Sequence, residues 1–485
     1  MRSHRRLRPE VDVSELWALT LRQAADGLAR RDFSSAELLE ATLERLEETE
    51  PAVHAYVTLM EETARGRAAA ADEELREGRW RGPLHGIPVG VKDLCYTKGV
   101  RTEAGSRVLE GFVPDHDATV VLRLKEAGAV IVGKTVTHEF AYGQDIPATR
   151  NPWDLDCYPG GSSAGSGVSV AVGSAFAAIG IDTGGSVRVP ASVNGVVGLK
   201  PTYGRVSKHG VIPMSPTLDT VGPLARTAED CALVLGVIAG HDPADSGSVP
   251  EAVPDFASAL SQGVDGLRLG LDREHFLSDR VVPEVRAACE AAIEELRSVG
   301  ADVVEVRLPE LAHASPAGMP VLLADTSEWH RHFLRTRGDR YVPATRLMLE
   351  LGEMVLGAQY VTAQRSRAWL RDRVRNSFDM HRLDGLVGPT LPTPTMPLEQ
   401  LSVDLTGGGE TKLSAFLRHC FAGNVVGIPA LSFPCGFSSE GLPIGLQVYG
   451  RPFEESKLFR VAHAYQQVSD WHQRRPQPQL KAGVR

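Results

Sequence analysis

From residue 84 onward, short runs of apolar residues alternate with segments that have helical periodicity. The runs 129–132, 175–181 and 196–199 contain only apolar residues and glycine. Such runs are typical of strands buried on both faces, because neither face meets water. The sequence therefore predicts an α/β fold in which a mixed, mostly parallel central β-sheet is covered by helices on both faces.

The first 80 residues have a different pattern, which predicts helices. Ser34 and Glu37 have the spacing of a capping box, and leucines then recur at helical intervals to about residue 48. A second helix, rich in alanine and charged residues, is expected over 61–78. We therefore divide the chain into an N-terminal helical segment, 1–80, and an α/β domain, 81–475.

Two loops rich in glycine and serine lie in the first half of the α/β domain. They are Pro159–Ser166 and Gly180–Pro190, and Lys92 lies upstream at the end of an apolar run. Either loop alone is typical of a flexible turn. A serine that attacks a carbonyl needs a base, a proton path and donors for the oxyanion, and the three segments together offer all of these. We therefore expect them to form one catalytic site.

The three segments resemble the signature blocks of the amidase signature family. The blocks correspond to 84–93, 160–166 and 182–190. Further similarity in the same order is found at 117–121, 128–135, 195–204, 427–434 and 441–447. The resemblance extends from about residue 20 to about residue 470 and is weakest between about 240 and 420. It implies the fold of that family and hydrolysis of a carboxamide C–N bond, with neither a metal nor an organic cofactor.

Carried over residue by residue, the resemblance implies three catalytic residues. Ser186 would be the nucleophile, Ser162 a bridging serine preceded by a cis peptide bond, and Lys92 the base. Burial at the end of a strand favours the neutral amine of lysine, because desolvation penalises the charged form. The neutral amine would take the proton of Ser186 through Ser162 and later return it to the leaving amine.

The same resemblance implies an oxyanion hole made of backbone N–H groups. The donors would be those of Thr183, Gly184 and Gly185, together with the N–H of Ser186. Two consecutive glycines allow successive N–H groups to point into one concavity, which stabilises a tetrahedral intermediate.

Asp182 and Arg188 flank this loop, and we interpret them as an ion pair that fixes its shape. Ser163 has a rival interpretation, because Gly161–Gly165 also matches the G-x-S-x-G elbow of α/β-hydrolases. That elbow requires a preceding buried strand, whereas 151–159 contains two prolines and three Asx residues and is typical of a loop. We therefore expect Ser163 to make a supporting hydrogen bond.

Substrate choice is expected to depend on 240–420, the variable region outside the signature core of 84–225. His138 is a candidate pocket residue, because many family members have other residues near it. Aromatic residues that could reach a pocket are Tyr142, Trp153, Tyr158, Trp329, Phe333, Tyr341, Tyr360 and Trp369. No group of residues suited to binding a carboxylate is evident near the signature blocks, which favours a neutral apolar or aryl amide.

Three alternatives stay open at this point. The same signature occurs in carbamate and ester hydrolases and in the glutamine-hydrolysing component of tRNA-dependent amidotransferases, which needs a partner protein. The third alternative is a non-catalytic binding protein on the same scaffold. The presence of all three expected catalytic residues argues against it.

Composition narrows the choice of partners. A net charge of −9 argues against general binding to nucleic acids or anionic membranes, and no apolar stretch reaches the ~18 residues of a spanning helix. We expect a cytoplasmic enzyme that acts on a small-molecule amide, with a homodimer left open. The six cysteines lie far apart without a C-x-x-C pair, which predicts free thiols and no metal site.

Overall fold

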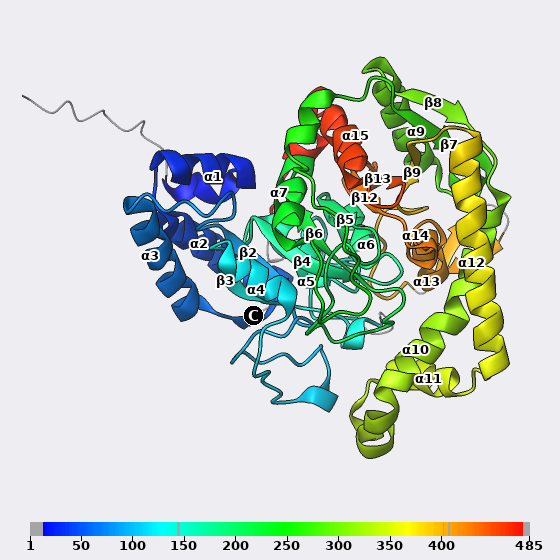
Figure 1. Ribbon diagram of the computed structural model, residues 1–485, viewed down its shortest axis with the longest axis horizontal. Helices are drawn as coiled ribbons and strands as arrows, with labels where there is room; N and C mark the ends of the chain where they lie inside the picture. The colour runs from blue at the N-terminus through cyan, green and yellow to red at the C-terminus, as the bar shows by residue number, and fades with distance from the viewer. Residues whose placement is uncertain (1–12, 143–145, 401, 406–407, 479–485) are drawn as a thin grey trace, which may run out of the picture.

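The computed structural model describes residues 13–142, 146–400, 402–405 and 408–478. Within these ranges an 11-stranded sheet forms the centre of the molecule, in the order β1-β3-β2-β4-β6-β5-β12-β13-β9-β7-β8 (Figure 1). Its strands are β1 (Tyr56–Leu59), β2 (Pro88–Lys92), β3 (Val130–Thr135), β4 (Ala177–Asp182), β5 (Val197–Lys200), β6 (Thr220–Ala225), β7 (Arg268–Leu271), β8 (Asp302–Glu305), β9 (Gly385–Pro389), β12 (Ala430–Phe437) and β13 (Pro443–Gly450). A separate hairpin is formed by β10 (Ser402–Leu405) and β11 (Gly408–Thr411).

Helices surround the sheet and lie between most of its strands in the chain. They are α1 (Leu21–Arg30), α2 (Ser35–Val53), α3 (Glu61–Arg76), α4 (Thr119–Glu126), α5 (Ala164–Val172), α6 (Arg188–Asn194), α7 (Ala228–Ile238), α8 (Arg273–Phe276), α9 (Pro283–Ser298), α10 (Ala314–Arg337), α11 (Pro343–Glu353), α12 (Gly357–Met380), α13 (Lys412–Arg418), α14 (Phe421–Val426) and α15 (Glu455–Val468). In this part of the chain no helix is both long and apolar enough to cross a bilayer.

The sheet is mixed, as predicted, but antiparallel neighbours outnumber parallel ones in it. Strand β2 is parallel to β3 and β4, and β7 is parallel to β8 and β9. All other neighbouring pairs of this sheet are antiparallel. One reason is that β12 and β13 are joined by a short turn, which permits only antiparallel pairing. Another is that β6 inserts between β4 and β5 and runs opposite to both.

Helices cover both faces of the sheet, as the apolar runs predict. Because side chains alternate along a strand, neighbouring residues face opposite layers. Ala178 and Leu224 pack in one cluster with residues of α5 and α6. Ile179 and Val221 pack instead in the main core, which includes α7. The strands of the signature core are therefore buried on both sides.

The N-terminal segment begins with the predicted capping box. Ser34 Oγ accepts the N–H of Glu37 at 3.1 Å, and the Glu37 carboxylate accepts the N–H of Ser34 at 2.7 Å. Helix α2 continues past the expected end to Val53. Strand β1 then pairs with β3, so this segment also supplies the edge of the sheet. The division of the chain into 1–80 and 81–475 stays a prediction.

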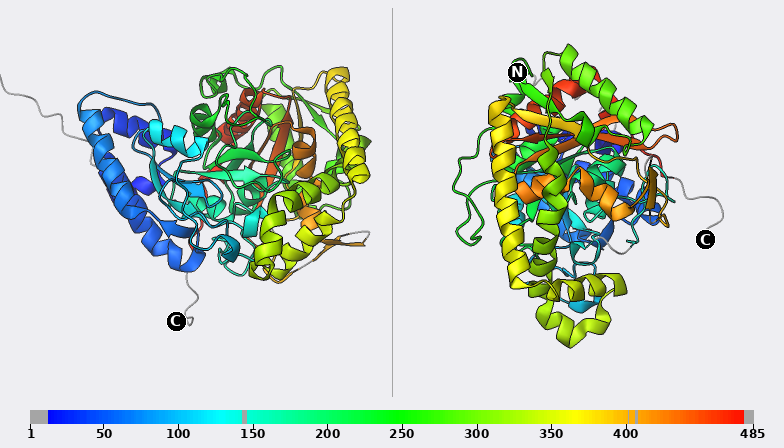
Figure 2. Two further views of the ribbon diagram at one scale, coloured as in Figure 1. Left: turned by 60° about the horizontal axis from the view of Figure 1, so that its bottom comes forward. Right: turned by 90° about the vertical axis from the view of Figure 1, so that its right-hand side faces the viewer.

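The helices α10, α11 and α12 lie near the opposite end of the molecule from α1–α3 (Figure 1). The long helices α10 and α12 run side by side, as the right-hand view of Figure 2 shows. They belong to the region expected to vary with substrate. One side of α10 approaches the loop that follows β4, so this helical layer takes part in enclosing the site described below.

Candidate active site

Lys92 is the last residue of β2, and its side chain is fully buried. Its Nζ lies 2.8 Å from Ser162 Oγ and 3.0 Å from Ser163 Oγ. Burial lowers the pKa of Lys92 to about 7, although Cys95, Asp219 and Asp182 act in the opposite direction. The amine is therefore largely neutral at mildly alkaline pH and can accept a proton.

The loop before α5 places Ser162 beside this amine. The peptide bond between Gly161 and Ser162 is cis, as the resemblance implies. Ser163 N–H donates to the carbonyl of Ser186 at 3.2 Å, which joins this loop to the loop after β4. Ser163 Oγ also lies 3.3 Å from the carbonyl of Ile181, so this hydroxyl has the bracing contacts expected of it.

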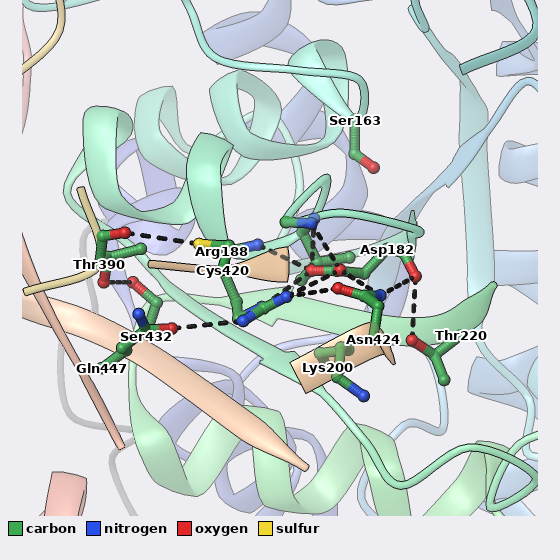
Figure 3. A network of polar contacts seen from close by, with 12 residues as sticks. Ser163, Asp182, Arg188, Lys200, Thr220, Thr390, Cys420, Asn424, Ser432 and Gln447 are labelled. Carbon is green, nitrogen blue, oxygen red and sulfur yellow. Dashed lines mark hydrogen bonds and ion pairs between the residues drawn. The ribbon is translucent and has the colours of Figure 1, made fainter. Parts of the chain in front are cut away.

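Asp182 ends β4 and organises the loop that carries Ser186. Its carboxylate accepts the N–H groups of Gly185 at 2.8 Å and Val187 at 3.1 Å. It also forms the expected ion pair with Arg188, with both N–O contacts at 3.1 Å and both side chains fully buried (Figure 3). Burial alone would raise the pKa of Asp182, but the charge and hydrogen bonds of Arg188 outweigh it and hold the pKa at about 2. The carboxylate is therefore ionised across the physiological range.

The backbone donors of this loop differ in one respect from the expected set. The N–H of Gly185 is engaged by Asp182, because a left-handed turn with φ +123° points it back toward the end of β4. The N–H groups of Thr183, Gly184 and Ser186 have no acceptor among the described residues. These three remain available to a developing oxyanion, and Gly185 braces the loop.

Residues distant in the sequence hold the Asp182–Arg188 pair in place. Asn424 of α14 donates to the Asp182 carboxylate at 2.9 Å and accepts from Arg188 at 2.8 Å. Gln447 of β13 accepts from Arg188 at 3.3 Å (Figure 3). Sequence reasoning missed both residues. Only Gln447 lay within a stretch that resembled the family, and no local pattern marked Asn424.

A cavity of about 250 Å³ opens beside these loops. Ser162, Ser186 and the 183–185 segment line one part of it. The rest of the lining is mostly apolar and includes Ala141, Tyr142, Ile146, Tyr158, Val189, Met214, Met319, Leu322, Met348, Leu413, Phe416 and Leu417. No charged side chain lines the cavity in the part of the chain that the structure describes. The two serines therefore face a largely apolar space.

Two of the eight candidate aromatic residues, Tyr142 and Tyr158, line this cavity. The other six do not: Trp153, Trp329, Phe333, Tyr341, Tyr360 and Trp369. Trp329, for example, packs against Phe140 and His330. The cavity methionines and Phe416 were missed, because nothing local in the sequence shows which face of α10, α11 or α13 meets the site.

His138 lies behind the cavity wall and is not part of its lining. Its Nε2 is 3.1 Å from the hydroxyl of Tyr158, and its N–H donates to the carbonyl of Ser162 at 3.3 Å. A side chain at Gly161 would collide with both His138 and Tyr158. His138 therefore supports the loop of Ser162 and does not reach the substrate space.

All six cysteines are buried as free thiols. Cys289 and Cys435 approach each other to 3.9 Å between sulfurs, on α9 and β12. Over the described ranges, no group of three or more His, Cys, Asp or Glu side chains is placed to hold a metal ion.

The sequence matches the protein family described as Amidase over residues 37–459. An amidase of Pseudomonas putida is 45% identical over 467 residues, which covers 96% of this chain and 99% of that protein. The A-type chain of the glutamyl-tRNA(Gln) amidotransferase of Chloroflexus aggregans is 43% identical over 493 residues, with the same two coverages. The solved structure of native peptide amidase from Stenotrophomonas maltophilia superposes with a TM-score of 0.83 at 34% identity, covering 95% of this chain and 98% of that one. The chain therefore belongs to the amidase signature family of hydrolases.

Proposed function

We propose that the chain hydrolyses the C–N bond of a small neutral carboxamide through an acyl-enzyme on Ser186. The observation that supports this most directly is the contact between the buried Lys92 amine and Ser162, 2.8 Å apart, at the edge of the cavity that Ser186 lines. A base with its pKa near 7 and a hydroxyl relay are what a serine nucleophile requires.

In the first step, neutral Lys92 takes the proton of Ser162 while Ser162 takes the proton of Ser186. The Ser186 oxygen forms a bond to the carbonyl carbon, and the carbonyl π electrons move onto oxygen. The free N–H groups of Thr183, Gly184 and Ser186 stabilise this oxyanion. The C–N bond then breaks, and the proton on Lys92 returns through Ser162 to the leaving amine.

In the second half, water attacks the acyl-enzyme by the same route. Lys92 accepts a proton from water through Ser162, and the tetrahedral intermediate expels Ser186 as an alcohol. The products are a carboxylic acid and an amine, and the enzyme is restored. Each proton that Lys92 takes up is returned in the same half-reaction, so no cofactor is needed.

The apolar cavity favours a neutral acyl or aryl group over glutamine. The ammonium and carboxylate of glutamine would lie without a charged partner in the described lining, and such burial costs free energy. The glutamine-hydrolysing component of an amidotransferase remains the second candidate because of the relative in Chloroflexus aggregans. Carbamates and esters present the same carbonyl to Ser186 and are the third.

A fluorophosphonate probe tests the nucleophile, because it phosphonylates an activated serine. We expect mass spectrometry to place the adduct on Ser186, and Ser186→Ala to lose both the adduct and turnover while remaining folded. Ser192→Ala, a buried serine on the following helix, serves as the matched control and should label normally. An unlabelled wild-type protein would favour the binding-protein alternative.

A substrate comparison separates the hydrolase candidates. The purified chain is offered an aryl amide, an anilide, an aryl carbamate, an ester and glutamine, and kcat/KM is measured for each. We expect the neutral amides to exceed glutamine clearly. A strong preference for glutamine, or activity only with an added partner protein, would favour the amidotransferase candidate. Homodimer formation and a cytoplasmic location stay predictions, and light scattering tests the first.

A further inference from the structure

The side chain of Thr183 is held by a carboxylate that belongs to another strand. Thr183 Oγ1 donates to Asp219 Oδ1 at 2.6 Å, and both side chains are buried. Asp219 directly precedes β6, and the antiparallel register of β4 and β6 pairs Asp182 with Thr220. This register brings Asp219 beside the first residue of the loop that carries Ser186.

Asp219 also holds the chain on its other side. Its carboxylate accepts the N–H of Met214 at 2.9 Å and that of Ser215 at 3.1 Å. Met214 lines the catalytic cavity, as Thr183 does. One carboxylate therefore joins a wall of the cavity to the loop with the free backbone donors.

This carboxylate differs from Asp182 in its charge balance. Asp182 is paired with Arg188, whereas Asp219 has no ion-pair partner among the residues that the structure describes. Burial raises the pKa of Asp219 to about 6, and its hydrogen bonds oppose that rise. A buried carboxyl without a cation costs folding free energy unless its oxygens are hydrogen-bonded. Stability alone gives little reason for a carboxylate here, which points to a role in the site.

We propose that Asp219 is a positioning residue that fixes the backbone N–H groups of the oxyanion loop by holding the Thr183 hydroxyl. This inference rests on the proposed function of that loop. The loop is then braced at two points, by Asp219 through Thr183 and by Asp182 through the N–H of Gly185. Gly184 has no side chain of its own to fix its N–H direction. Donors that are not held in place lose much of their effect on a developing charge.

The decisive variant is Thr183→Val, which removes the hydroxyl and keeps the shape of the side chain. We expect kcat to fall by about 10-fold or more while KM changes little, because the donors act on the transition state. Thr183→Ser keeps the hydroxyl and is expected to retain most of the activity. Unchanged kcat in Thr183→Val would overturn the proposal.

A double-mutant cycle tests whether the two residues act together. We expect Asp219→Asn to lower kcat, and Asp219→Asn/Thr183→Val to be no worse than the more impaired single variant. Losses that multiply in the double variant would overturn the proposal. If Asp219→Asn does not fold, the Thr183→Val and Thr183→Ser pair decides alone.

Thr217→Val is the matched control. Thr217 Oγ1 donates to Asp325 at 2.7 Å, so the variant breaks the same kind of bond two residues from Asp219 but away from the cavity. Its kcat should be unchanged, and an equal loss there would show a general packing effect and overturn the proposal. Fluorophosphonate labelling of the wild type keeps the two levels apart. A labelled, active wild type with an unimpaired Thr183→Val defeats only this inference, whereas an unlabelled, inactive wild type defeats the proposed function itself.

Discussion

Lys92 can act as a base only when it is uncharged, and burial sets the pH at which that happens. Because burial lowers the pKa of Lys92 to about 7, kcat/KM should rise with pH through one ionisation near that value and then level off. Steady-state rates between pH 5.5 and 9.5 measure this, in buffers with and without a chelator, which should make no difference. Lys92→Arg remains charged and should be inactive throughout. A rate that falls from pH 6 to pH 8 would contradict the assignment of the base.

Ser162 and Lys92 belong to one proton path, which has a measurable signature. We expect Ser162→Ala and Lys92→Ala each to lower kcat by about 10²- to 10⁴-fold, because either change interrupts proton transfer. Once one is absent, the other has little left to contribute, so the double variant should lose far less than the product of the single losses. Single-turnover rates on an activated anilide measure all three. Fully multiplicative losses would show that the residues act independently.

At the residue scale, the sequence predicted the part of the site that lies in local motifs. Lys92, Ser162 and Ser186 lie in short blocks whose residue types suit the chemistry, and the structure brings Lys92 and Ser162 into contact. Residues defined by distant contacts escaped prediction. Asn424 reaches Asp182 across more than two hundred residues of chain, and no local pattern encodes such a meeting.

At the element scale, the capping box of α2 offers a test that separates stability from activity. Ser34→Ala removes the side-chain acceptor of the Glu37 N–H and should lower the free energy of unfolding by about 1 kcal/mol. The helix lies far from Ser186, so kcat should not change. Urea unfolding followed by circular dichroism measures the first quantity, and Ser34→Asp, which can still cap, is the control. A large loss of kcat would mean that α2 is coupled to the site.

The elements that were predicted correctly have uninterrupted patterns, and those that were missed do not. The apolar runs before Lys92 and around residues 130 and 180 appear as β2, β3 and β4. Strands β6 and β12 were not predicted, because Pro223 and Pro434 stand within them and proline argues against a strand. The pairing of β12 is irregular just after Pro434, which is how that strand accommodates it. Pairing partners, and thus strand direction, depend on the whole chain.

At the scale of the whole molecule, buried lysines make stability depend on pH. Burial lowers the pKa of Lys92 to about 7, and burial together with the nearby Arg188 does the same for Lys200. In the unfolded chain both pKa values return to 10.5, so between about pH 7 and 10.5 the unfolded state binds more protons than the folded state. Stability contributed by these groups therefore rises with pH across that window.

Lys92→Met isolates one of these contributions. The variant should be more stable than wild type at pH 7, and its advantage should shrink toward pH 10 by up to ~1.4 kcal/mol per pH unit. Thermal unfolding midpoints at pH 6, 7, 8 and 9.5 measure the difference, and Lys200→Met gives an independent comparison. Parallel curves for variant and wild type would mean that Lys92 keeps an ordinary pKa in the fold.

The buried thiols have a practical consequence. Native protein presents no cysteine to a thiol reagent, so each thiol reacts only when its own part of the molecule opens. The six positions run from the end of β2 to β12 and therefore form a built-in set of clocks for local unfolding. Cys420 packs directly against Gly185, where an added Cβ would lie 2.8 Å from its own. Its rate of alkylation times the opening of the oxyanion loop, and an inhibitor bound covalently to Ser186 should slow that one clock more than the others.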